Sequence, residues 1–117
     1  MSLLWVMAGG AIGSGLRYLL ATRITQFEWF GGFPLGTLTV NLAGCFLIGL
    51  MSTALPAEHP SRLVLMVGLL GGFTTFSSFG LETLSLINEG RIAHATLYLL
   101  LSNAGGVLLA LLGSRLT

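Results

Sequence analysis

The sequence has no lysine and no aspartate, and its charged side chains are limited to five arginines and four glutamates. These make up 8% of the 117 residues, whereas charged residues are about 25% of a typical soluble domain. A water-soluble surface cannot be built from so few charges. The scarcity excludes a soluble enzyme, and it leaves no basic patch that could bind nucleic acid.

The residue types that carry most enzyme chemistry are also scarce. The two histidines, His59 and His94, have no companions at metal-ligand spacing, and no paired carboxylates are present. No phosphate-binding loop occurs, which excludes an ATP-driven pump within this chain. The single cysteine, Cys45, lies in an apolar stretch, and we interpret it as a packing residue. The sequence therefore predicts that the protein is not an enzyme.

Apolar residues are abundant instead, at 54% of the chain with a mean hydropathy of +0.91. They form four runs of about the length that a helix needs to cross a bilayer, roughly 20 residues. The runs cover residues 3–21, 33–55, 63–88 and 92–114, which leaves connections at 22–32, 56–62 and 89–91. We therefore expect an all-α membrane protein with one domain, residues 1–117, of four transmembrane helices.

The arginines are balanced between the two ends of these helices. Arg62 and Arg115 fall at one end, Arg23 and Arg91 at the other, and Arg17 lies within the first span. Because Lys and Arg near short loops normally mark the cytoplasmic side, this balance predicts insertion in both orientations. Two oppositely oriented copies could then form an antiparallel homodimer.

The size of the chain also favours association, because four helices are too thin a bundle to enclose a polar path and shield it from lipid. The sequence has 17 glycines, and several lie at helix-contact spacing, such as Gly9 with Gly13 and Gly105 and Gly106 near Gly113. Small residues let membrane helices approach closely. Helix packing is the simplest interpretation of most of them.

Polar residues at membrane depth are costly and therefore informative. Thr37 and Asn41 are four residues apart in the second span and share one helical face. The Asn41 amide needs partners for both its donor and its acceptor side. Tyr98 and Ser102 show the same spacing in the fourth span, with Asn103 adjacent. Two polar faces are therefore expected inside the membrane.

The most unusual segment is GGFTTFSSFG, residues 71–80, near the middle of the third span. Three glycines, two threonines and two serines make it a poor helix at the depth where backbone hydrogen bonds are hardest to replace. We predict that the third helix is broken here, with Phe76 and Phe79 on one side of the helix that follows. The alternative is that both rings are packing residues and that Ser77 and Ser78 bond back to their own helix.

Taken together, these groups favour binding of an anion. Hydroxyls and an amide donate hydrogen bonds, and the rim of a phenyl ring carries the positive part of its quadrupole. Weak donors at close range can replace part of the hydration shell of a small ion without holding it too tightly. The pattern itself does not select one anion.

Three segments resemble the CrcB/Fluc family of fluoride channels, small bacterial and archaeal proteins that relieve fluoride toxicity. They are GGAIGSGLRY at Gly9–Tyr18, PLGTLTVNLAGCFLIG at Pro34–Gly49 and GGFTTFSSFGLE at Gly71–Glu82. The third is highly specific, and the likeness extends over essentially the whole chain. The resemblance implies a fluoride-selective channel in the cell inner membrane, an antiparallel dual-topology homodimer with two pores and a structural sodium ion at its centre.

The resemblance also assigns residues. It implies that Asn41 reaches the phenylalanine pair from across the dimer and that backbone carbonyls of Gly71 and Thr74 hold the sodium ion. Arg17 matches a position in the vestibule, where it would draw anions or bond to a loop. The fluoride pathway implied by the family lies on the second, third and fourth spans: Thr37, Asn41, Thr75, Phe76, Ser78, Phe79, Tyr98 and Ser102.

The sequence departs from the family pattern at two positions. Gly106 follows Ser102 by one turn, where many members carry serine, so the far end of the polar face is open to question. Asn103 would substitute poorly, because it points about 100° away. The motif also reads FSSF where FSTF is more frequent, a change that should have a mild effect.

A proton-coupled exporter of the small multidrug-resistance type is the main competing interpretation, because such exporters are also short four-span proteins. They need a titratable carboxylate inside the membrane. Glu28, Glu58 and Glu89 belong to loops or span ends, and Glu82 comes late in the third span. A non-transporting scaffold would leave the Thr/Ser/Phe run without a purpose. The sequence therefore favours passive conduction.

Overall fold

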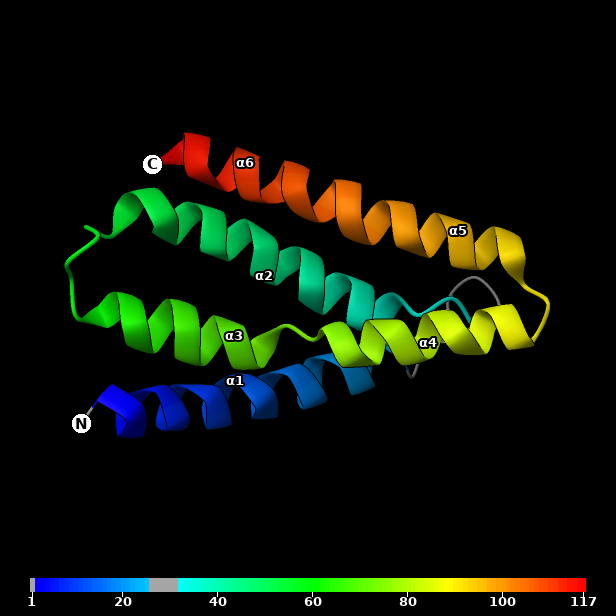
Figure 1. Cartoon of the computed structure of the whole chain (residues 1–117), viewed down its shortest axis with the longest axis horizontal. Helices are drawn as coiled ribbons and strands as arrows, with labels where there is room; N and C mark the ends of the chain where they lie inside the picture. The colour runs from blue at the N-terminus through cyan, green and yellow to red at the C-terminus, as the bar shows by residue number, and fades with distance from the viewer. Residues whose placement is uncertain (1, 26–31) are drawn as a thin grey trace.

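The computed structural model describes residues 2–25 and 32–117, and all the regular secondary structure in these residues is helical. Four helices are long and apolar enough to cross a membrane, which confirms the four predicted spans (Figure 1). The first is α1, Ser2–Thr25, and the second is α2, Leu35–Ala54. The expected connection at 22–32 lies partly outside the described residues, as does Glu28.

The third and fourth spans each contain more than one helical segment. The third comprises a π-helical segment η2, Leu63–Leu70, then α3, Gly71–Phe73, and α4, Phe76–Asn88. The fourth comprises α5, Ile92–Leu100, a π-helical segment η3, Leu101–Gly105, and α6, Gly106–Leu116. π-Helical turns are rare and frequently mark functional sites. Here η2 directly precedes the polar run at 71–80, and η3 contains Ser102 and Asn103.

Several helix ends differ from the expected bounds. The first helix continues to Thr25 rather than ending at Ala21, and the Thr22 hydroxyl is bonded to the Tyr18 carbonyl one turn back. The second helix begins at Leu35 rather than Phe33, because Pro34 has no N–H and adopts a non-helical conformation before it. The fourth helix runs two residues further than expected, to Leu116.

Between α3 and α4 the backbone leaves the helical conformation. Thr74 has φ −87° and ψ 157°, and Thr75 has φ −146° and ψ 124°. Two extended residues therefore separate the helical segments of the third span, inside the run at 71–80. Figure 1 shows this as a thin link between the α3 and α4 ribbons.

Close backbone approach joins the helices in pairs. A Cβ atom at Gly9 would lie 2.8 Å from the Val64 carbonyl oxygen, so only glycine lets α1 reach η2. Gly49 and Gly113 bring α2 and α6 together in the same way, because a Cβ on either would overlap backbone atoms of the other helix. These contacts fit the expected role of small residues in membrane helix packing.

The tight turn predicted at residues 89–91 is present. Gly90 has φ 75°, its N–H donates to Ile87, and the Arg91 N–H donates to Leu86. This pair of bonds is a Schellman motif, in which a left-handed residue closes the end of a helix. It turns the chain from α4 directly into α5.

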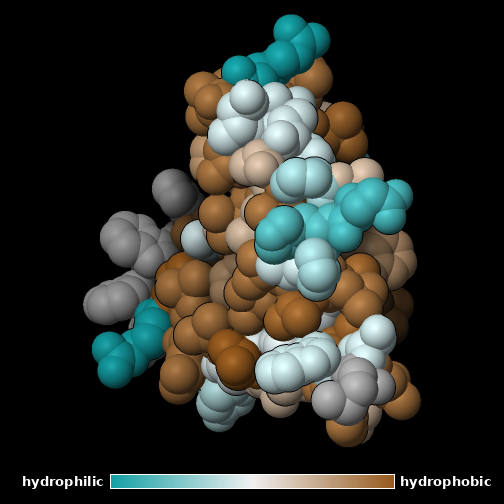
Figure 2. All heavy atoms as spheres, turned by 90° about the vertical axis from the view of Figure 1, so that its left-hand side faces the viewer, coloured by the Kyte–Doolittle hydropathy of each residue, from teal (hydrophilic) through white to brown (hydrophobic). Residues whose placement is uncertain are grey.

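The buried core is small and lies where α2, α4 and α5 meet, with aromatic rings at its centre. Most other large apolar side chains are exposed, for example Leu3 at 69% and Val107 at 71%. At the end of the molecule that carries both termini, apolar atoms cover most of the surface and hydrophilic atoms form a few separate groups (Figure 2). Such a surface suits lipid or another protein rather than water.

Candidate functional site

The two extended residues, Thr74 and Thr75, form an interruption in the third span, and the Asn41 side chain is bonded to it. Its side-chain nitrogen donates to the Thr75 carbonyl at 2.9 Å, and its side-chain oxygen accepts from the Thr75 N–H at 2.8 Å. The amide thus pairs with the extended backbone of Thr75 as a neighbouring strand would. Both halves of the Asn41 amide are satisfied within its own chain, and its reach across a dimer stays a prediction.

Threonine side chains satisfy further backbone groups on both sides of the interruption. The Thr75 hydroxyl accepts from the Ser78 N–H at 3.2 Å and caps the start of α4. On the other side, the N–H and the hydroxyl of Thr74 both donate to the Leu70 carbonyl, at 3.0 and 3.1 Å. The two threonines therefore have separate tasks, one at each helix end.

This arrangement removes the usual hydrogen-bond partners of two carbonyls. In a continuous α-helix the Thr75 N–H would donate to Gly71, and the Ser78 N–H would donate to Thr74. Here the first donates to Asn41 and the second to the Thr75 hydroxyl. The carbonyls of Gly71 and Thr74 are thus available to another donor or to a cation.

Arg17 binds the end of α3. Its Nε donates to the Gly72 carbonyl at 3.2 Å, and the Ser14 hydroxyl approaches the same oxygen at 3.5 Å. A cation at a helix C-terminus is favourable, because the unpaired carbonyls there carry partial negative charge. Of the two roles considered for Arg17, this contact supports a structural one, with a helix end rather than a loop as the partner, and attraction of anions remains a prediction.

Aromatic rings form a continuous series from the interruption toward the end of the molecule that carries the turn between α4 and α5, which we call the loop end. Phe76 and Phe79 have centroids 5.6 Å apart, and Phe79 meets Tyr98 edge-on at 5.0 Å. Phe33 also meets Tyr98 edge-on, at 5.7 Å. Phe79 is 7% exposed and Phe76 is 79% exposed, so the series begins at the surface and passes into the core. Phe33 was not among the predicted residues, because it lies before α2 and no pattern in the sequence distinguishes it.

Two hydroxyls beside these rings lack hydrogen-bond partners. Within residues 2–25 and 32–117, the buried Tyr98 hydroxyl and Ser102 Oγ have no partner. They lie one turn apart, Tyr98 in α5 and Ser102 in η3. A buried hydroxyl without a partner costs about 1–3 kcal/mol. A pair of them marks a place where a hydrogen-bond acceptor from outside the protein would be stabilised.

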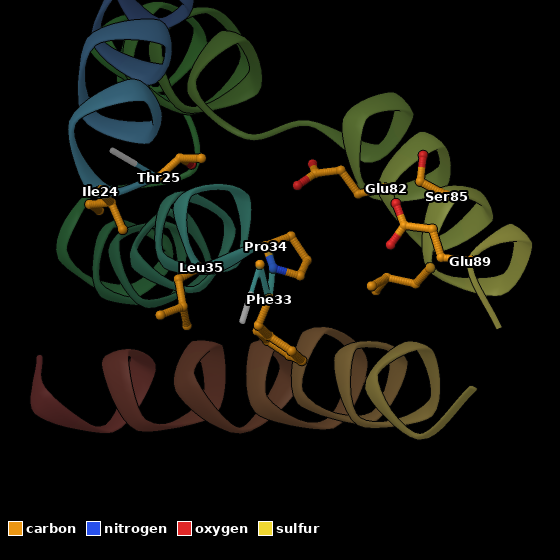
Figure 3. Close-up of a pocket in the computed structure, with 10 residues that line it drawn as sticks. Ile24, Thr25, Phe33, Pro34, Leu35, Glu82, Ser85 and Glu89 are labelled. Carbon is orange, nitrogen blue, oxygen red and sulfur yellow. The ribbon is translucent and has the colours of Figure 1, made fainter. Parts of the chain in front are cut away.

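Thr37 is paired with a carboxylate that the sequence analysis left without a role. The Thr37 hydroxyl donates to Glu82 Oε1 at 2.5 Å. Glu82 also lines a pocket of about 450 Å³ at the loop end of the helices, together with Ser85 and Glu89. Figure 3 shows the carboxylates of Glu82 and Glu89 extending from α4 toward Phe33 and Pro34. The partner of Thr37 could not have been found from spacing, because 45 residues separate the two.

A second cavity, of about 300 Å³, lies at the interruption itself. It brings together predicted residues from three spans, because α2, the third span and η3 all contribute to its wall. Arg17, Thr37, Ser78 and Tyr98 lie outside its wall. Predicted residues in the wall are Asn41, Gly71, Thr74, Thr75, Phe76, Phe79 and Ser102.

Cys45 lies next to Gly106, the position at which the sequence departs from the polar face of the fourth span. A Cβ atom on Gly106 would lie 3.1 Å from the Cys45 sulfur, so a serine there would be crowded. Cys45 also lines the 300 Å³ cavity, and Gly106 does not. The thiol therefore takes the space into which a larger residue at 106 would project. Asn103 lines the cavity too, although its amide nitrogen bonds back to Leu99 at 2.8 Å.

These features define a small multi-pass membrane protein with an aromatic and hydroxyl-lined track beside an interrupted helix. Residues 4–114 match the family described as "CrcB-like protein, Camphor Resistance (CrcB)", and the chain belongs to that family.

Three relatives carry the name "Fluoride-specific ion channel FluC". That of Chlorobium phaeobacteroides (strain BS1) is 47% identical, over 98% of this chain and 91% of its own length. That of Elusimicrobium minutum (strain Pei191) is 48% identical, over 92% and 83%. That of Helicobacter pylori (strain J99 / ATCC 700824) is 43% identical, over 90% and 84%. The relatives are ion channels by name, which agrees with the prediction that this protein is not an enzyme.

Proposed function

We propose that this protein is a fluoride-selective channel that lets fluoride leave the cell passively and so relieves fluoride toxicity. The fold supplies four membrane spans, and the relatives at 43–48% identity are named fluoride-specific channels. The inner membrane is the site where such export would protect a bacterial cell. Passive flux is favoured because coupled export would need a carboxylate inside the membrane that carries protons. Within the described spans the carboxylate is Glu82, and it is bonded to Thr37.

The observation that carries this proposal is the pair of unpartnered hydroxyls at Tyr98 and Ser102. They lie beside the ring of Phe79, which meets Tyr98 at 5.0 Å. Hydroxyl donors and ring edges both favour negative charge. Fluoride is the smallest halide and the strongest hydrogen-bond acceptor among them, so it gains most from short donors in a narrow track. A larger halide gains less and has more difficulty fitting.

In this mechanism the ion loses its hydration shell in steps. The cavity at the interruption presents Phe76, the Phe79 ring and the hydroxyls of Thr75 and Ser102. The ion would pass along Tyr98 toward Thr37 and the pocket at the loop end. Each donor is weak, which allows the ion to leave as well as to bind.

We further propose that the working unit is an antiparallel homodimer with two such pathways. The 300 Å³ cavity is open, and Phe76 on its rim is 79% exposed. A phenyl ring that carries an ion-binding edge requires cover, and a second copy would supply it. The balance of arginines between the two ends of the helices is compatible with insertion in both orientations.

The carbonyls of Gly71 and Thr74 fit the structural sodium ion implied by the family. Their helical partners are bonded to side chains, and oxygen ligands at the C-terminal end of a half-helix suit a monovalent cation. Both residues line the open cavity. Bound there, sodium would supply positive charge to the carbonyls, while Asn41 holds the Thr75 peptide in place.

Fluoride efflux from reconstituted liposomes tests the proposed function, with chloride efflux as the reference. We expect fluoride flux without a proton gradient, and its collapse in Phe76→Ile and in Asn41→Asp. Tyr98→Phe removes only the unpartnered hydroxyl and should slow fluoride efflux by about tenfold, the weight of one hydrogen bond to an anion. Tyr18→Phe is the matched control, because Tyr18 is 69% exposed on α1. Equal fluoride and chloride fluxes would overturn the proposal.

The sodium and dimer proposals need their own test. A Cβ atom on Gly71 would lie 3.8 Å from the Met66 carbonyl oxygen, so Gly71→Ala fits within one chain. Bulkier replacements, Gly71→Leu and Thr74→Leu, should lower the fraction of dimer that can be cross-linked. Adding sodium should also raise that fraction less in these variants than in the parent protein. Gly80→Ala, at an open helical position, is the control. Dimers that persist in both leucine variants, with normal fluoride flux, would show the cation assignment to be wrong.

A further inference from the structure

We propose that the groove between the start of α1 and η2 binds an anionic phospholipid. The phosphate would lie against Arg62 and His59, and an acyl chain would follow Trp5 and Val67. The groove has a volume of about 500 Å³. It lies at the end of the molecule where the termini and the loop between α2 and η2 meet (Figure 1). This proposal is separate from the ion pathway, because none of the residues in the groove lines the cavity at the interruption.

The lining of the groove divides by depth. Polar side chains come from the ends of helices and from the loop, at Ser2, His59 and Arg62. Most of the apolar side chains come from the helices, at Trp5 and along η2 at Leu63, Val64, Met66 and Val67, and Ala57 and Pro60 add two from the loop. Val67 follows Arg62 by five positions, so it lies about one helical turn further into η2. A polar rim over an apolar floor at this spacing matches a lipid headgroup over the start of its acyl chain.

His59 is prepared to donate a hydrogen bond into the rim. Its Nδ1 accepts from the Ser61 N–H at 3.2 Å and lies 2.6 Å from the Ser61 hydroxyl. A backbone N–H is only a donor, so Nδ1 is the acceptor and the proton of the neutral ring is on Nε2. That leaves the Nε2–H for an acceptor outside the loop. The His59 side chain is exposed, and a phosphate oxygen suits it.

Arg62 supplies the charge. One of its terminal nitrogens donates to the carbonyls of Leu55 at 2.7 Å and Ser52 at 3.3 Å, which fixes the guanidinium at the rim. No acidic side chain pairs with it within the parts of the chain that the structure describes, and Glu58 is not in the groove. At the opposite end, by contrast, Arg91 pairs with Glu89 at 3.8 Å. A fixed guanidinium without a protein counter-charge at the membrane surface favours an anionic lipid.

The apolar floor needs cover of its own. Trp5 is 56% exposed and Val67 is 58% exposed, and tryptophan is enriched where membrane helices meet the headgroups. An acyl chain covers such side chains while the headgroup remains at the rim. A free anion would leave this floor uncovered, and a second copy of the chain would bring no negative phosphate to Arg62.

Quenching of Trp5 fluorescence by brominated lipid tests the proposal. The chain has two tryptophans, and Trp29→Phe leaves Trp5 as the sole reporter. The full-length variant is reconstituted in phosphatidylcholine vesicles, and phosphatidylglycerol or phosphatidylcholine with brominated acyl chains replaces the host lipid stepwise. We expect half-maximal quenching at an about fivefold lower mole fraction of the anionic lipid, the weight of one arginine near a membrane surface.

Variants locate the effect. In Arg62→Gln the two brominated lipids should become equivalent, whereas Arg115→Gln should retain the preference because Arg115 is outside the groove. His59→Ala should weaken the preference without disturbing the bonds from Arg62 to α2, so it serves if Arg62→Gln does not fold. Equal quenching by both lipids in the parent would overturn the proposal. So would quenching by neither, since that means a second copy covers Trp5, and so would a preference that survives both groove variants.

Discussion

Replacing Asn41 by alanine should destabilise the protein more than any other change to a single polar side chain in the second span. The substitution removes a donor and an acceptor that pair with the two backbone groups of Thr75, at 2.9 and 2.8 Å. Thr75 is extended, and its own N–H and carbonyl find no partners in a helix. Alanine would therefore leave the N–H and the carbonyl of Thr75 unsatisfied at membrane depth.

The size of the effect can be bounded from these two bonds. Side-chain hydrogen bonds in membrane proteins contribute about 0.6 kcal/mol each on average, which gives roughly 1 kcal/mol for the pair. Leaving a buried backbone group without a partner costs about 1–3 kcal/mol, so the loss rises toward about 3 kcal/mol if water does not enter. Asn41→Asp keeps the acceptor for the Thr75 N–H and sets two oxygens against each other in place of the second bond. It should also be destabilising.

Reversible unfolding of the purified protein in mixed detergent micelles measures these differences. Asn103→Ala is the matched control, because the Asn103 amide bonds only to the Leu99 carbonyl within its own helix, at 2.8 Å. We expect a loss of about 1–3 kcal/mol for Asn41→Ala and less than about 0.5 kcal/mol for Asn103→Ala. Equal stabilities would refute the argument that Asn41 holds the interruption together.

Two other comparisons use the same unfolding assay. Gly90→Ala should cost about 1 kcal/mol, because φ is 75° there and left-handed backbone disfavours a Cβ, whereas Gly80→Ala in an open helical position should stabilise slightly; a neutral Gly90→Ala would contradict the assigned turn. Arg17→Leu should cost about 1–2 kcal/mol, because it removes both the bond to the Gly72 carbonyl and the charge at the end of α3. Arg23→Leu is its control, because it removes a charge from the last turn of α1, and a loss as large in that variant would show that Arg17 acts through its charge alone and not through the bond to Gly72.

The four spans could be predicted from the sequence because each is a long apolar run with few charges. The turn at Gly90 was also accessible, since glycine between charged residues at a helix end is a local signal. Helix ends were less accessible, as the continuation of α1 to Thr25 illustrates. Thr22 is compatible with a loop or with a last helical turn, and the neighbouring residues do not decide between them.

The partners within the candidate site could not be predicted, because they are far apart in the sequence. Asn41 and Thr75 are 34 residues apart, and Arg17 and Gly72 are 55 apart. The chemistry of the amide indicates that Asn41 needs two partners, but spacing along one helix cannot identify them. The same limit applies to Phe33, which becomes part of the aromatic series only when α5 places Tyr98 beside it.

The order of these partners along the chain has a consequence for biosynthesis. Ser14, Arg17 and Asn41 all precede the interruption that they satisfy, so the ribosome makes each of them before Thr74 and Thr75. Unpaired backbone is costly in lipid, and a third span that arrived first would have to be inserted with its peptide groups exposed. In this chain the side chains that bond to the interruption belong to the first two spans, which enter the membrane before the third span is made. A circular permutation that moved the third span ahead of the first two would remove that advantage and should lower the yield of inserted protein.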